Sequence, residues 1–136
     1  YTDDFVGTWK KENVLTYTAI EYISHTHTYS IAKVSNSEIV LTGNVLRKYN
    51  FIDGRTGPTS LKWNYDYSIN IKLDNAEKFS LNTDKLPVKF TDTNGISNTQ
   101  LMPVALFFSK SGSNLKLIAS MKHLTFDLGG DYVLSK

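Results

Sequence analysis

The stretch Leu61–Leu73 reads LKWNYDYSINIKL, and its apolar residues fall at every second position. The odd-numbered positions carry Leu, Trp, Tyr, Tyr, Ile, Ile and Leu, whereas the even-numbered positions carry Lys, Asn, Asp, Ser, Asn and Lys. Successive side chains of a β-strand point to opposite faces, so this pattern predicts one long strand with an apolar face and a solvated face. A helix is excluded, because a period of two would spread the apolar residues around its whole circumference.

Alternating runs on both sides of this stretch predict an all-β chain. Turn-forming residues separate them at Ser35–Ser37, Gly43–Asn44, Asp92–Gly95 and Ser111–Asn114. No helical pattern lies between the runs, so we expect antiparallel neighbours rather than parallel βαβ units. The sequence predicts about eight to ten strands, with the further strands at residues 23–31, 39–41, 45–52, 79–81, 86–90, 101–108, 115–124 and 132–134.

Composition supports this fold class and excludes several functions. The chain of 136 residues holds 31 Thr, Ile or Val residues but only 5 Ala and 4 Glu, and it fits a single domain over residues 1–136. The net charge of +2 argues against broad binding to nucleic acid, and no apolar run is long enough for a transmembrane helix. Cysteine is absent, so no disulfide framework is expected.

Both ends of the chain carry a family resemblance. The opening Phe5-Val6-Gly7-Thr8-Trp9-Lys10 resembles the Gly-x-Trp signature of lipocalins and other calycins, and the closing segment 131–136 resembles the ends of small lipocalin-like domains in Bacteroidetes-type lipoproteins. The resemblance implies an up-and-down β-barrel in which Trp9 plugs the closed end and Gly7 lets the first strand bend. It also implies an exported protein, periplasmic or at the cell surface, with a lipidated cysteine upstream of Tyr1.

The chain also departs from this family. Lipocalins commonly place an arginine late in the barrel over the signature tryptophan, but Arg47 and Arg55 both lie in the first half, which leaves Lys122 as the substitute. The fatty-acid-binding branch needs a helical lid and internal arginines, whereas residues 14–31 have a strand pattern. A β-sandwich therefore stays open as the alternative to a barrel.

His25 and His27 form the most reactive-looking motif. Two histidines two residues apart on a strand share one face, which suits a transition metal if a third ligand is supplied by His123, Asp66 or Glu21. The simpler interpretation is a hydrogen-bonded pair on a half-buried strand. We adopt it and expect neither a metal nor a cofactor.

Trp63, Tyr65 and Tyr67 form an aromatic row that could line a cavity or stack on a surface sugar. We favour an ordinary core or a cavity lining over a sugar platform, because so long an exposed apolar stripe would promote aggregation. The sequence thus predicts a non-enzymatic binding module for a small, largely apolar ligand. Its ligand-binding residues are expected to be Ile23, His25, His27, Tyr29, Trp63, Tyr65 and Tyr67.

The segment Leu101–Phe108 is apolar at both odd and even positions. Such a strand needs cover on both faces, either from a loop of this chain or from a partner. Pro103 cannot donate a ladder hydrogen bond, so it predicts an edge or a bulge. The alternative function is therefore an interaction domain that associates through this segment. We expect the protein to be a monomer or a weak homodimer. No nucleophile elbow or phosphate loop is present, so we expect no enzyme.

Overall fold

The computed structural model describes residues 3–17, 21–51, 60–73, 75, 77–123 and 126–136. Those residues form nine strands, and none of them lies in a helix that could cross a membrane. The strands are β1 (Gly7–Tyr17), β2 (Glu21–Ser35), β3 (Glu38–Phe51), β4 (Ser60–Lys72), β5 (Lys78–Thr91), β6 (Ser97–Ser111), β7 (Asn114–His123), β8 (Phe126–Asp127) and β9 (Gly130–Leu134).

Each strand from β1 to β8 pairs antiparallel with the next strand along the chain. The last strand, β9, pairs with β7 and reaches β1 through Lys10 and Ser135, whose backbone N–H groups donate to each other's carbonyl oxygens at 2.8 and 3.2 Å. Eight strands, with β9 between β7 and β1, therefore form a nearly closed up-and-down barrel. The predicted barrel is confirmed, and it is compatible with a lipocalin-like fold.

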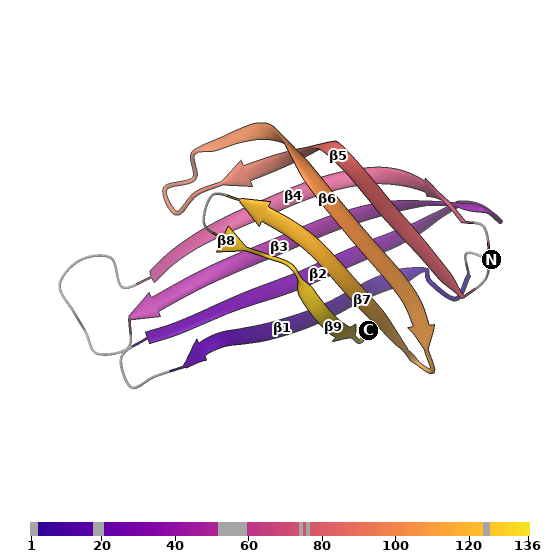
Figure 1. Ribbon diagram of the computed structural model, residues 1–136, viewed down its shortest axis with the longest axis horizontal. Coiled ribbons are helices and arrows are strands. Elements are labelled where there is room, and N and C mark those ends of the chain that lie inside the picture. Colours follow the sequence, from indigo (N-terminus) through magenta and orange to yellow (C-terminus); the bar gives the residue numbers. More distant parts are fainter. Residues whose placement is uncertain (1–2, 18–20, 52–59, 74, 76, 124–125) are drawn as a thin grey trace.

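The barrel is flattened into two crossing layers. Strands β4 and β5 pair over only three residue pairs, between residues 64–66 and 89–91. Outside that short ladder β5 diverges from β4. Figure 1 shows β5, β6, β7 and β9 crossing over the layer formed by β1 to β4. Only residues 18–20 separate β1 from β2, which leaves no room for the helical lid of the fatty-acid-binding branch.

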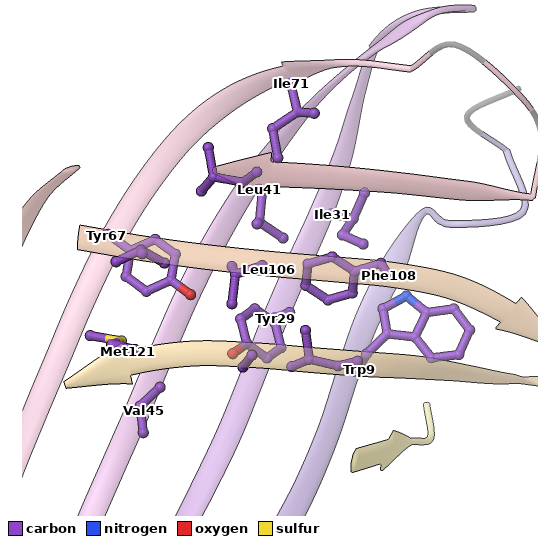
Figure 2. Packing of buried hydrophobic residues seen from close by; sticks show 14 of the residues in the cluster. Trp9, Tyr29, Ile31, Leu41, Val45, Tyr67, Ile71, Leu106, Phe108 and Met121 are labelled. Carbon is purple, nitrogen blue, oxygen red and sulfur yellow. The ribbon is translucent and has the colours of Figure 1, made fainter. Parts of the chain in front are cut away.

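The space between the two layers is filled by the predicted apolar faces. From Met102 to Phe108 of β6 every second side chain is buried, namely Met102, Val104, Leu106 and Phe108. They meet the inward residues of the other layer, including Trp9, Tyr29 and Leu41, and Figure 2 shows this packing. The period-two pattern of the sequence therefore decides which side chains form the core.

One predicted turn is wrong. Gly43 and Asn44 lie in the middle of β3, so the runs at 39–41 and 45–52 belong to one continuous strand. The glycine pairs with Tyr67 of β4, and a Cβ at residue 43 would lie 2.4 Å from the Cζ atom of Tyr67. Glycine is needed there because a ring lies on the backbone, and not because the chain reverses.

A second pair of predicted strands also merges. Residues 79–81 and 86–90 belong to the single strand β5, whose pairing with β6 shifts between Thr83 and Leu86. Pro103 of β6 lies opposite this shift, between the paired residues Met102 and Val104. The bulge predicted from Pro103 is therefore present, because proline cannot complete the ladder at that point.

Candidate functional site

The strand register brings the residues predicted to bind a ligand onto neighbouring positions of the inner face. Tyr29, Gly43 and Tyr67 form one cross-strand row of β2, β3 and β4. The next row holds His27, Val45 and Tyr65, and the one after it holds His25, Arg47 and Trp63. Most of these side chains are buried, with Tyr65 at 0% and Tyr67 at 5% exposure, while Ile23 and Trp63 are half-buried.

His27 lies at the centre of this region. Its Nδ1 atom is 3.1 Å from the Tyr29 hydroxyl, within hydrogen-bond distance. The ring of Tyr132 from β9 packs against the imidazole, with 4.4 Å between ring centroids. The His25 ring is 6.4 Å away on the same strand. The two layers of the barrel therefore meet at His27.

Several polar atoms in this region have no hydrogen-bond partner in the described structure. They are both ring nitrogens of His25, the Nε2 atom of His27 and the hydroxyl of Tyr67. Figure 2 shows the phenol oxygens of Tyr29 and Tyr67 turned toward each other inside the barrel. We call His25, His27, Tyr29 and Tyr67 the inner polar cluster. Buried unpaired groups are rare in native proteins and call for a functional or structural reason.

Burial keeps the cluster uncharged at neutral pH. Desolvation, with a smaller contribution from the Arg47 guanidinium, lowers the pKa of His25 to about 4. Desolvation, with a smaller contribution from His25, lowers the pKa of His27 to about 4 as well. Burial also raises the pKa of the Tyr29 and Tyr67 phenols well above the usual range. The cluster therefore offers neutral hydrogen-bonding groups to the interior.

Two residues near the cluster were missed in the sequence. Arg47 lies on the inner face of β3, next to His25, with its guanidinium carbon 5.6 Å from the centroid of the Trp63 ring. It has the same parity as Val45, so the alternation within residues 45–52 could have placed it inside. Tyr132 comes from the other end of the chain, and its hydroxyl donates to the Gly129 carbonyl at 2.8 Å. No local pattern could have paired Tyr132 with His27.

The geometry does not bring together a third metal ligand from among the described side chains. Asp66 lies on the outer face of β4, where its carboxylate accepts a hydrogen bond of 2.7 Å from the Asn44 amide. The side chains of Glu21 and His123 lie outside the described residues. No group of three His, Cys, Asp or Glu residues that could hold a metal occurs in the part of the chain that the structure describes.

Trp9 forms a separate buried centre. Its indole N–H donates to the Phe5 carbonyl at 2.8 Å, and its ring is 1% exposed. The ammonium groups of Lys110 and Lys136 each lie 5.0 Å from the ring centroid. Two cations therefore lie over Trp9, and the expectation that Lys122 takes this place is wrong, because Lys122 is exposed on β7.

Gly7 and Lys136 meet beside this centre. Gly7 has a φ of +136°, and a Cβ there would lie 2.9 Å from the Cε atom of Lys136. An L-residue rarely adopts this φ, and its side chain would collide with the lysine stem that covers Trp9. Glycine thus permits both the bend of the chain and the approach of its last residue.

The sequence predicts a cover over both faces of the segment Leu101–Phe108, but its outer face is exposed in the structure. Leu101 and Phe107 are 62% and 50% exposed, although the inward residues of the same strand are buried. Ile118 of β7 and Val133 of β9 are also exposed. Among the described residues, no segment lies over this apolar surface as a further layer.

Comparison with known proteins adds no relative. The chain gives no significant match to family models, to curated proteins or to solved structures. Its function therefore has to be argued from the inner polar cluster and the outer surface alone.

Proposed function

We propose that this barrel is a binding module for a small, largely apolar ligand whose polar end meets the inner polar cluster. The observation that carries the proposal is the set of unpaired nitrogens and oxygen on His25, His27 and Tyr67. Leaving a buried polar group without a partner costs about 1–3 kcal/mol. A ligand that pairs with these atoms would recover this free energy, whereas a purely structural core would have no use for them.

The chemistry of the cluster suggests the polar end of the ligand. The two histidines are neutral at pH 7, so His25 offers one donor and one acceptor nitrogen, whereas His27 offers only Nε2 because its Nδ1 is within hydrogen-bond distance of the Tyr29 hydroxyl. A hydroxyl, carbonyl or amide group fits such partners. The aromatic and aliphatic side chains around them would hold the apolar body of the ligand.

Binding at this site requires movement. The cluster side chains are at most 5% exposed, so a ligand has to displace packed groups before it reaches them. Arg47 and Trp63 are only half-buried in the row that includes His25, which makes this side of the barrel the entry route. Because binding includes this rearrangement, we expect association below the usual ~10⁵–10⁷ M⁻¹s⁻¹.

The test uses N-phenyl-1-naphthylamine, an uncharged fluorescent probe with an apolar body and one N–H donor. We expect slow, saturable binding with a blue-shifted emission, and at least about tenfold weaker binding by the His27→Phe variant, since the lost hydrogen bond is replaced by an apolar edge. Tyr22→Phe, which removes a half-buried hydroxyl away from the cluster, is the matched control. Absence of saturable binding, or equal loss in both variants, would contradict the proposal.

Export and a lipid anchor also remain predictions of the resemblance. Labelling of the full-length protein with a palmitate analogue, followed by cell fractionation, tests them. A labelled protein in the membrane fraction is the expected result, and an unlabelled protein in the cytoplasm would contradict it.

A second candidate function is association through the outer face of β6. The exposure of Leu101, Phe107, Ile118 and Val133 favours it, because singly scattered apolar residues are ordinary but neighbouring ones mark interaction surfaces. A surface sugar platform built from the aromatic row is not favoured, since Tyr65 and Tyr67 lie in the core.

A further inference from the structure

The outer surface of the barrel has a groove that the interior site does not involve. It has a volume of about 770 Å³ and runs over β5, β6, β7 and β9, which lie side by side in Figure 1. This volume is in the range of small-molecule sites, roughly 300–1,000 Å³. The groove is lined on one part by apolar side chains and on another by lysines.

The apolar part is formed by Phe107, Ile118 and Val133. Phe107 and Ile118 are directly paired across β6 and β7, and Val133 of β9 is paired with Lys116. All three point away from the core and are 49–56% exposed. Phe107 and Ile118 are therefore adjacent in one row, whose β9 member is Asp131, while Val133 lies diagonally from Ile118 and beside Lys116.

The cationic part adjoins these apolar side chains. Lys78, Ser109 and Lys116 form one cross-strand row of β5, β6 and β7. Neighbouring strands are ~4.8 Å apart, so the two lysine backbones are separated by roughly 10 Å with the serine hydroxyl between them. Two flexible ammonium groups can reach one anion above that hydroxyl. Lys72 adds a third cation to the lining.

These lysines have no carboxylate partner in the described structure. The ion pair found there joins Lys33 to Asp3, and it lies outside the groove. The acidic residue of the lining, Asp131, is in the row of Phe107 and Ile118 and does not come within 4.0 Å of a lysine nitrogen there. The groove therefore carries a net positive charge, from three lysines against one aspartate, beside the apolar side chains of Phe107 and Ile118.

We propose that this groove binds a small amphiphilic anion, with its sulfonate, sulfate, phosphate or carboxylate head between Lys78 and Lys116. The apolar body of the ligand would lie on Phe107, Ile118 and Val133. A second copy of the chain fits less well, because its own patch carries three lysines against one aspartate and therefore lacks the negative charge that complements the groove. Charge complementarity thus selects an anionic occupant with an apolar part.

The test uses 8-anilinonaphthalene-1-sulfonate, titrated into the ¹⁵N-labelled protein and followed by fluorescence and amide chemical shifts. We expect saturable one-to-one binding, with the largest shifts at Phe107, Ile118 and Val133. The double variant Lys78→Gln/Lys116→Gln should bind roughly tenfold more weakly, from two exposed charge contacts worth up to about fivefold each. The matched control Lys48→Gln/Lys62→Gln removes the same charge from a paired, exposed row of β3 and β4, and should bind like the wild type.

Three results would overturn the proposal. Equal weakening in both double variants would mean that net charge alone attracts the probe. Shifts centred on His27 and Tyr67 would move the probe to the barrel interior. Sedimentation with phosphatidylglycerol vesicles that depends on Lys78 and Lys116, without saturable probe binding, would make a membrane surface the occupant. None of these results depends on binding of the uncharged naphthylamine, so the two proposals stand or fall separately.

Discussion

Replacing Tyr67 by phenylalanine separates a ligand site from an ordinary core. The Tyr67 ring lies on Gly43, and its buried hydroxyl faces the Tyr29 hydroxyl without a hydrogen bond of acceptable distance and angle in the described structure. The substitution Tyr67→Phe keeps the ring and removes only that oxygen. If the hydroxyl is kept for a ligand, the ligand-free protein should become more stable without it.

The expected size follows from the burial of the hydroxyl. An unsatisfied buried polar group costs about 1–3 kcal/mol, and the small void left by the oxygen offsets part of the gain. We therefore expect the free energy of unfolding to rise by about 1 kcal/mol. For a chain of this length, this corresponds to a melting temperature higher by roughly 3–4 °C.

Tyr29→Phe is the matched control for this experiment. The Tyr29 hydroxyl lies 3.1 Å from the Nδ1 atom of His27, so its removal leaves a further unpaired nitrogen in the cluster. We expect this variant to be less stable than the wild type by about 1–2 kcal/mol. The same chemical change should thus have opposite effects at two neighbouring positions of the core.

The assay is urea unfolding at pH 7, followed by tryptophan fluorescence and by circular dichroism, with coincident transitions required. A lower stability for Tyr67→Phe would refute the reasoning, because it would show that the hydroxyl already has a partner in the folded protein. Equal losses in both variants would refute it in the same way.

The remaining predictions concern packing, pH and the outer face. Gly43→Ala should lose about 1–3 kcal/mol of stability in urea unfolding, because its methyl group would collide with the Tyr67 ring, and wild-type stability would contradict the close approach. The histidine pair of the cluster has a pKa of about 4 when folded and 6.5 when unfolded, so the unfolded chain binds more protons between these values. The free energy of unfolding should therefore fall as the pH drops from 6.5 toward 4, by up to about 1.4 kcal/mol per pH unit for each histidine. The variant His27→Gln should halve this dependence of stability on pH. An unchanged dependence would contradict burial of the pair. Phe107→Lys should fold normally because that side chain is half exposed, whereas Phe108→Lys should not fold because Phe108 is 1% exposed. Circular dichroism distinguishes a folded from an unfolded variant. Similar circular dichroism spectra for the two variants would contradict the register of β6.

The last of these predictions corrects an expectation from the sequence. The segment Leu101–Phe108 is apolar at every position, so Phe107 and Phe108 look equivalent as contacts of a partner. The fold assigns them to opposite faces, with Phe108 stacked on Phe79 at 4.6 Å between ring centroids. Light scattering of the folded Phe107→Lys variant is therefore the informative test of self-association.

The inner face of the barrel was largely predictable from the sequence. The alternation in residues 61–73 placed Tyr65 and Tyr67 on one apolar face, and the alternation in 23–31 did the same for His25 and His27. Side-chain direction in a strand changes with every residue, so parity is a local property that a sequence carries by itself. The role of these residues in binding a ligand stays a prediction.

The groups that surround this face were decided by the tertiary structure. Register and barrel closure are non-local, and they alone bring Tyr132 onto His27 and the ammonium groups of Lys110 and Lys136 over Trp9. The role of Gly43 was also decided by the tertiary structure. A glycine followed by asparagine is typical of a turn, but the Tyr67 ring of the neighbouring strand lies against the Gly43 backbone. The sequence by itself determined which sides of the strands are apolar, whereas only the closure of the sheet decided which residues those sides meet and which charges gather outside.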